Sequence, residues 1–187
     1  DSRIGSKFLY PGPGFGGSCF PKDVKALIKT GKDHGTPLTL LESVEAINER
    51  QKMVLFGKFS DYYKADIRGK RAAIWGLSYK PGTDDMREAP SLTLISQLLE
   101  AGCTIIAYDP AAMDEARQRL GIKIEYAADI YDAVAGADVL FHVTEWKEYR
   151  MPDWEKIRKL MKTPLLIDGR GVFDKDNLAG ITYLRIG

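Results

Sequence analysis

This sequence has few cysteines and few histidines. Its two cysteines, Cys19 and Cys103, lie far apart in the chain. They exclude a disulfide framework of the kind that stabilises small secreted proteins, so a reducing compartment, the cytoplasm, is expected. The two histidines, His34 and His142, have no partner at metal-ligand spacing, and His142 falls within an apolar strand. No metal site is therefore expected, and a cysteine–histidine hydrolase is disfavoured.

An excess of charge of one sign and long apolar runs are also missing. The 27 Lys and Arg residues nearly balance the 26 Asp and Glu residues, which argues against a nucleic-acid partner. No apolar run approaches the ~20 residues of a membrane-spanning helix, so no membrane partner is expected. The chain opens with Asp1 rather than an initiator methionine. We therefore expect it to be a fragment of a longer protein.

A glycine cluster that ends in a cysteine, Gly14-Phe15-Gly16-Gly17-Ser18-Cys19, precedes a predicted helix over 21–33. Glycines let a ligand approach the main chain closely, and Pro21 suits a first helical turn. Cys19 is thus expected at a helix N-terminus, where the helix dipole and the nearby Lys22 favour the thiolate. A thiolate in such a pocket is a candidate nucleophile. The alternative is a small buried core residue, which is the commoner role of a lone cysteine.

A second and longer helix is predicted from 38 to about 64. Its apolar residues recur at three- and four-residue steps, as in an amphipathic helix. More than ~25 residues is long for a helix within a compact domain. We expect it to lie between two domains or at a homodimer interface. Four polar residues are expected on its solvent-exposed face: Glu45, Asn48, Glu49 and Arg50.

After Gly69, apolar strands alternate with helices of about ten residues, which predicts an α/β fold with a doubly wound parallel sheet. Strands are expected at 71–77, 104–108, 122–126, 138–144, 164–168 and 181–186. Helices are expected at 91–101, 112–120, 130–135 and 154–161. The predicted domains are a helical segment over 1–67 and a Rossmann-like sheet domain over 68–187.

Ligands of such sheets bind at the carboxyl ends of the strands. Lys80 and Arg170 follow the first and fifth predicted strands and could converge on an anion there. The turn Gly76-Leu77-Ser78 lacks the second glycine of the dinucleotide fingerprint G-x-G-x-x-G. The sheet is thus expected to bind a nucleotide-like anion rather than NAD, although charged loops also occur at strand ends without any ligand.

Four blocks of the sequence resemble the UDP-glucose 6-dehydrogenase family, in the family's order and spacing. Residues 14–23 resemble its active-site cysteine segment, and residues 3–9 resemble a loop that reaches the substrate in part from a neighbouring subunit. Residues 76–88 resemble the block that opens its UDP-binding domain, and Asp168-Gly169-Arg170 resembles its C-terminal arginine motif.

The resemblance implies an NAD-dependent oxidation of UDP-glucose to UDP-glucuronate, through a thiohemiacetal and a thioester on Cys19. It implies that Asp23 helps to position or activate water, and that Lys22 and Arg87 lie at the cofactor. The substrate contacts that it implies are Arg3, Phe8, Leu9, Tyr10, Gly14, Phe15, Gly16, Tyr79, Lys80 and Arg170. Arg3 would reach across a homodimer that forms through the helix 38–64.

The sequence departs from this family by lacking its NAD-binding domain. NAD would be held mainly by that missing N-terminal domain, so the chain alone is expected to be inactive. A fragment of a GDP-mannose or other nucleotide-sugar dehydrogenase is one alternative. A non-catalytic nucleotide-binding or dimerisation module is another.

Overall fold

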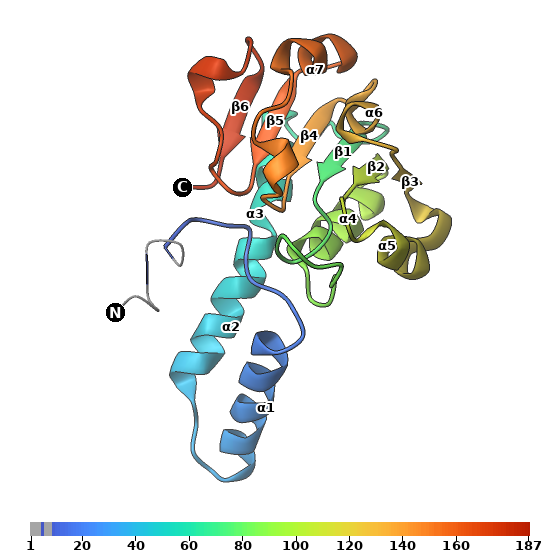
Figure 1. Ribbon diagram of the computed structural model, residues 1–187. Helices are drawn as coiled ribbons and strands as arrows, with labels where there is room; N and C mark the ends of the chain where they lie inside the picture. Colours follow the sequence, from blue (N-terminus) through green and yellow to red (C-terminus); the bar gives the residue numbers. More distant parts are fainter. Residues whose placement is uncertain (1–4, 6–8) are drawn as a thin grey trace.

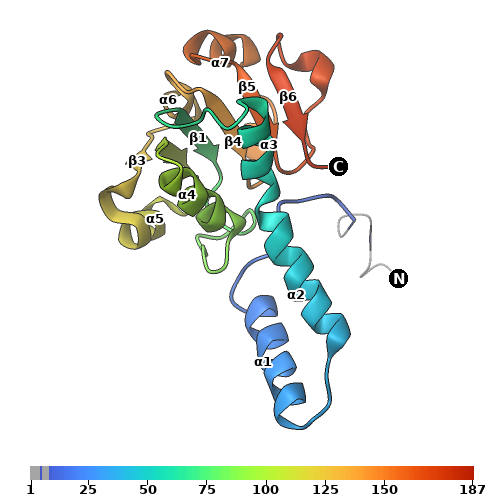
Figure 2. The ribbon, with the colours of Figure 1, turned by 180° about the vertical axis from the view of Figure 1, so that it is seen from behind.

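The computed structural model of the protein describes Gly5 and residues 9–187. A sheet covered by helices forms the body of the molecule, and a pair of antiparallel helices projects from it (Figure 1). The pair consists of α1 (Phe20–Asp33) and α2 (Thr39–Lys52). The same arrangement is seen from behind in Figure 2.

The sheet has six strands, all parallel, in the order β3-β2-β1-β4-β5-β6. This is the strand order of doubly wound nucleotide-binding folds, so the predicted fold class is confirmed. The strands are β1 (Arg71–Trp75), β2 (Thr104–Tyr108), β3 (Glu125–Tyr126), β4 (Val139–His142), β5 (Leu165–Asp168) and β6 (Thr182–Arg185).

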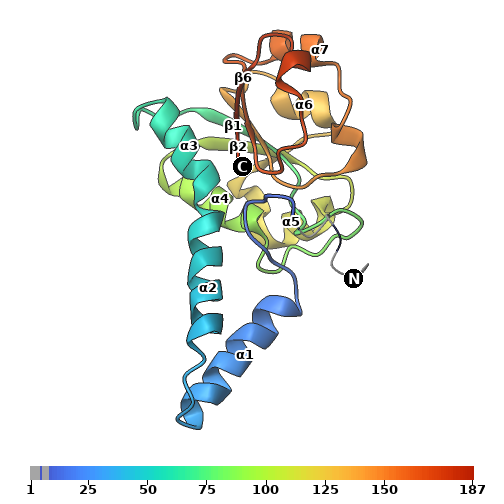
Figure 3. The ribbon, with the colours of Figure 1, turned by 90° about the vertical axis from the view of Figure 1, so that its left-hand side faces the viewer.

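Two apolar layers sandwich the sheet, because successive residues of a strand point to opposite faces. In β1, Ala72 and Ile74 pack on one face, while Ala73 and Trp75 pack on the other. The first face is covered by α3 (Val54–Tyr62), α4 (Pro90–Glu100) and α5 (Met113–Leu120). The second is covered by α6 (Ile130–Val134) and α7 (Trp154–Leu160), as the view in Figure 3 shows.

The third strand is shorter than predicted. Residues 122–126 alternate between apolar and polar, but a short 3-10 helix, η2 (Gly121–Lys123), takes the first part and β3 keeps two residues. The side chain of Ile122 is fully exposed, so the alternation of apolar and polar residues there does not mark a buried face of a strand. Two further 3-10 turns, η3 (Lys147–Tyr149) and η4 (Lys175–Asn177), lie in the loops after β4 and β5.

The predicted helix over 38–64 is wrong as one continuous element, because it is interrupted at Met53. The Met53 amide bonds the carbonyl of Arg50, three residues back, instead of continuing the four-residue pattern. Beyond the interruption, Leu55 and Phe59 are fully buried against the sheet. α2 has no side chain buried against the sheet in this way, so the packing of α3 on the sheet explains the break at Met53. The helices of the described ranges include none long and apolar enough to cross a membrane.

The core crosses the predicted boundary between residues 67 and 68. Leu55, Phe59 and Ile67 belong to the same buried cluster as the strand residues Ile74 and Phe141. α3 therefore packs as a layer of the sheet body. The division of the chain into two functional domains stays a prediction.

Candidate functional site

Cys19 lies immediately before the first residue of α1, as predicted, and is exposed. Its carbonyl accepts a hydrogen bond from the Asp23 amide (2.9 Å), which closes the first helical turn. The Ser18 hydroxyl lies 3.6 Å from Cys19 Sγ. Lys22 and Asp23 form an exposed ion pair (3.4 Å) within this turn. The sequence pattern therefore placed the thiol at a helix N-terminus correctly.

The glycine loop before Cys19 packs against the segment that follows β1. The Gly17 amide donates to the Arg87 carbonyl (2.7 Å). Gly17 has a φ of +93°, and a Cβ there would lie 2.8 Å from the Tyr79 ring. Only glycine combines this conformation with so close an approach. The structure thus brings the Cys19 loop to Tyr79 and Arg87, which are distant in sequence.

Two polar side chains of α2 hold the loop from the other side. Asn48 accepts from the Phe15 amide (2.7 Å) and donates to the Phe15 carbonyl (3.2 Å), and Gln51 donates to the Gly12 carbonyl (2.7 Å). The prediction that Asn48 is solvent-exposed is wrong, since its side chain is buried against this loop. Its partners are backbone atoms of a distant loop, so no local sequence pattern identifies it.

Asp85, Arg87, Tyr79 and Lys80 lie together in the segment after β1. Arg87 donates through Nε and Nη2 to the two carboxylate oxygens of Asp85, both at 2.9 Å. The Arg87 hydrogen bonds outweigh burial and hold the pKa of Asp85 below its usual value. Lys80 is exposed, and its ammonium lies 5.3 Å from the centre of the Tyr79 ring. Arg87 and Lys80 are therefore accessible to an anionic ligand.

Arg170 follows β5 and is largely buried. Its Nε lies 2.9 Å from Glu145 Oε2 and donates to the Val143 carbonyl (2.7 Å). Burial lowers the pKa of Arg170, and the carboxylates of Glu145 and Asp168 oppose that effect. Glu145 is thus the counter-ion of a predicted substrate contact, a role that its position in a strand-end loop does not reveal.

Lys80 and Arg170 lie in the loops that follow β1 and β5, and these two strands flank β4. Two strand spacings set the ends of these strands about 10 Å apart. The cations thus belong to one edge of the sheet, although each has its own side-chain partner in this structure. A ligand diphosphate there would compete with Glu145 for Arg170.

The loop over residues 9–17 runs from Arg170 to Cys19. A Cβ at Gly12 would lie 3.1 Å from Arg170 Nη1, so the loop passes directly over that guanidinium. Leu9 and Tyr10 are exposed at its start. Two predicted substrate contacts, Arg3 and Phe8, lie outside the described residues.

The turn after β1 is closed to a dinucleotide pyrophosphate. The amides of Leu77 and Ser78 both donate to Asp109 Oδ2 (2.7 and 3.1 Å). Thr144 packs so closely on Gly76 that a Cβ there would lie 2.4 Å from Thr144 Cβ. In dinucleotide-binding folds, the equivalent turn leaves its amides free for phosphate. This geometry supports the prediction that the sheet domain does not hold NAD at that turn.

Asp168 holds the turn that carries Arg170. His142 Nδ1 donates to Asp168 Oδ1 (2.8 Å), and the Arg170 amide and the Tyr183 hydroxyl also donate to this carboxylate (2.8 and 2.9 Å). Burial alone would raise the pKa of Asp168, but these hydrogen bonds lower it to about 2. The His142 side chain is completely buried at the end of β4, where it makes this contact.

Because of these hydrogen bonds, the free energy of unfolding should depend on pH. The pKa of Asp168 is lowered from 3.8 to about 2 on folding, so its stabilisation is present above pH 4 and is lost as the pH falls towards 2. The loss should amount to roughly 2 kcal/mol. Urea unfolding at pH 5 and pH 2.5 measures it, and Asp168→Asn should show a smaller difference. Asp114→Asn, at an exposed carboxylate, is the control that keeps the full difference. Equal pH dependence in Asp168→Asn and the unmodified chain would contradict this account.

Known proteins match this chain over its full length. The model of the UDP binding domain of the UDP-glucose/GDP-mannose dehydrogenase family matches residues 73–175, and the central-domain model of that family matches residues 1–50. A UDP-glucose 6-dehydrogenase of Rhizobium meliloti is 46% identical over all of this chain and 43% of its own length. The same figures hold for a UDP-glucose 6-dehydrogenase of Pseudomonas aeruginosa.

A solved structure shows the same fold. The UDP-glucose dehydrogenase from the archaeon Pyrobaculum islandicum matches with a TM-score of 0.84 and 30% identity, over 100% of this chain and 40% of its own. The chain thus spans less than half the length of the relatives that it matches. On the match of both family models, the chain belongs to the UDP-glucose/GDP-mannose dehydrogenase family.

Proposed function

We propose that this chain supplies the nucleophilic cysteine and the nucleotide-sugar site of an NAD-dependent UDP-glucose 6-dehydrogenase. The observation that carries the proposal is the hydrogen bond between the Gly17 amide and the Arg87 carbonyl (2.7 Å), which joins the Cys19 loop to the segment bearing Tyr79 and Lys80. In this proposal residues 1–67 form the helical region and residues 68–187 bind UDP. The NAD-binding domain lies outside the chain, which alone is inactive. The two free cysteines suit a reducing cytoplasm.

Cys19 would act in the second half of the reaction. The NAD bound by the other domain supplies the hydride acceptor for both oxidations. The Cys19 thiolate adds to the carbon of the C6 aldehyde, and the carbonyl oxygen takes up a proton to give a thiohemiacetal. This carbon then loses hydride and the hydroxyl loses its proton, which leaves a thioester. Water cleaves the thioester, releasing the carboxylic acid and the thiol.

The remaining residues would bind and orient. Asp23 lies one turn after Cys19, where its carboxylate can position the attacking water. Lys80 and Arg170 would neutralise the diphosphate, and Tyr79 lies beside Lys80. Arg87 and Lys22 are exposed, and they would contact the cofactor near the Cys19 turn.

Thiol labelling tests this proposal. Iodoacetamide should alkylate the exposed Cys19 and spare the buried Cys103, which serves as an internal control. UDP-glucose should slow the alkylation of Cys19, whereas GDP-mannose at the same concentration should protect it less. Stronger protection by GDP-mannose would favour the other branch of the family. No protection by either ligand at millimolar concentration would favour a non-catalytic module.

We also propose that the chain forms a homodimer through the projecting helix pair. Leu27, Leu40 and Ile47 on α1 and α2 are each more than half exposed. Exposed apolar groups of this kind mark association surfaces. Sedimentation should therefore show a dimer, and Ile47→Glu should shift it towards monomer. Ile122→Glu changes a fully exposed isoleucine of the sheet body and should leave the dimer intact. A strict monomer at high micromolar concentration would contradict the proposal.

A further inference from the structure

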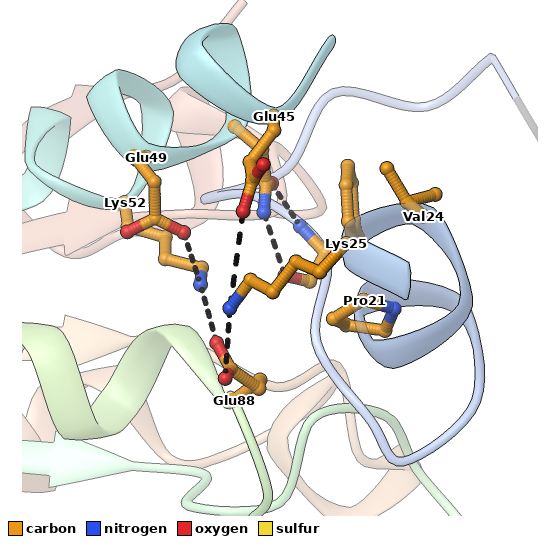
Figure 4. Close-up of a pocket in the computed structure, with 9 residues that line it drawn as sticks. Pro21, Val24, Lys25, Glu45, Glu49, Lys52 and Glu88 are labelled. Atoms are coloured by element: carbon orange, nitrogen blue, oxygen red, sulfur yellow. Dashed lines mark hydrogen bonds and ion pairs between the residues drawn. The ribbon is translucent and has the colours of Figure 1, made fainter. Parts of the chain in front are cut away.

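Glu88 joins three parts of the molecule through its carboxylate. Oε1 lies 3.0 Å from Lys25 Nζ of α1, and Oε2 lies 3.5 Å from Lys52 Nζ of α2. Glu88 itself belongs to the segment after β1, two residues before α4 begins. Figure 4 shows the Glu88 side chain below the ammonium groups of both lysines, joined to each by a dashed line, with Glu45 and Glu49 above them. The carboxylate thus bridges the sheet body and both projecting helices.

The bridge is charged and partly shielded from solvent. The side chain of Lys52 is 3% exposed, and Glu49 Oε1 lies 2.8 Å from its ammonium. The hydrogen bond to Lys25 holds the pKa of Glu88 below its usual value despite burial, and that bond raises the pKa of Lys25. Both partners are therefore ionised at neutral pH. Removing the Glu88 carboxylate would leave the buried ammonium of Lys52 with Glu49 as its remaining ion-pair partner among the described residues, which costs free energy in a site shielded from water.

The backbone at Glu88 is as constrained as its side chain. Its φ is +54°, a conformation that residues other than glycine seldom adopt. Its carbonyl lies against Gly16, where a Cβ would come within 2.4 Å of the oxygen. The preceding residue, Arg87, accepts the hydrogen bond from Gly17. A strained residue is retained where the surrounding contacts require it, and here those contacts are the glycine loop and the two lysines.

We infer that Glu88 is a positioning residue that fixes the Cys19 turn relative to the segment carrying Tyr79 and Lys80. The inference rests on the proposed role of Cys19 and deepens it. Cys19 is held by α1, whereas the nucleotide-sugar would be held by the sheet body. Thiohemiacetal formation needs the sulfur within contact distance of the aldehyde carbon. Lys25 lies six residues after Cys19 in α1, and its ion pair with Glu88 connects α1 to the sheet body. The pair therefore sets the distance between the Cys19 sulfur and the bound substrate.

Glu88→Gln tests the inference because it keeps the size of the side chain and removes its charge. In the full-length protein, kcat should fall about 10- to 100-fold, while KM for UDP-glucose stays within about twofold. Lys25→Met should cause a similar fall, and the double variant should be no worse than the more impaired single variant. In the chain itself, amide exchange at Gly17 should become about tenfold faster in Glu88→Gln.

The Lys32–Glu42 pair provides the matched control. It also joins α1 to α2 (3.1 Å), but it involves no residue of the sheet body. Lys32→Met should leave kcat and Gly17 exchange unchanged. Full turnover in a folded Glu88→Gln variant, or an equal fall in Lys32→Met, would overturn the inference. Cys19→Ser in the same assay distinguishes a failure of this inference from a failure of the proposed function, because an active Cys19→Ser variant would show that Cys19 is not the nucleophile.

Discussion

Replacing Cys19 with serine in the full-length protein should reduce net formation of UDP-glucuronate by about 10³-fold or more. A serine hydroxyl is far harder to ionise near neutral pH than a thiol, so the thiohemiacetal would not form. Chromatography of the sugar nucleotides after timed incubation with UDP-glucose and NAD measures the product directly.

Cys103→Ser is the control for this experiment. Cys103 is buried, and its thiol donates to the Ile67 carbonyl (3.2 Å), a bond that serine can replace. This variant should keep most of the activity. Near-normal acid production by Cys19→Ser would exclude Cys19 as the nucleophile, whatever Cys103→Ser does.

The second large effect is expected at Arg170. Arg170→Ala removes the counter-ion of Glu145 and leaves that carboxylate partly buried and unpaired, which should destabilise the fold by about 1–3 kcal/mol. The variant should also bind UDP-glucose more weakly, because charge-assisted bonds to phosphate are lost. Thermal unfolding and ligand titration measure the two effects separately.

The double variant Arg170→Ala with Glu145→Gln separates stability from binding. It should regain most of the lost stability, because the buried carboxylate is gone, while binding of UDP-glucose stays about 10- to 100-fold weaker. Lys80→Ala, at an exposed position, should weaken binding without affecting unfolding. Restoration of affinity in the double variant would show that Arg170 does not contact the ligand.

The fold could be predicted because its strands carry a strong local signal. The apolar run Ala72-Ala73-Ile74-Trp75 is buried on both faces of a parallel sheet, and glycines and prolines mark its helices and turns. The break at Met53 could not be predicted, since no glycine or proline lies there and packing of Leu55 and Phe59 on the sheet decides it. Ile122 misled the prediction because it is an exposed residue in an alternating pattern.

The candidate site was only half visible in the sequence. The place of Cys19 at a helix N-terminus could be predicted, because glycines and Pro21 surround it. Asn48, Glu88 and Glu145 could not be found in this way. Asn48 and Phe15 are 33 residues apart, and Lys25 and Glu88 are 63 residues apart. Their roles depend on contacts that exist only after the helices fold onto the sheet body.

Calorimetric titration of this chain with UDP-glucose, with NADH formation followed in parallel, tests most directly whether the chain holds the nucleotide-sugar site but not the NAD site. The residues proposed to hold uridine and diphosphate lie within the chain, whereas the turn after β1 that would take NAD is closed by Asp109 and Thr144. We expect measurable binding of UDP-glucose, weakened in Lys80→Ala, and no NADH formation. NADH formation by the chain, or no binding at millimolar UDP-glucose, would contradict this expectation.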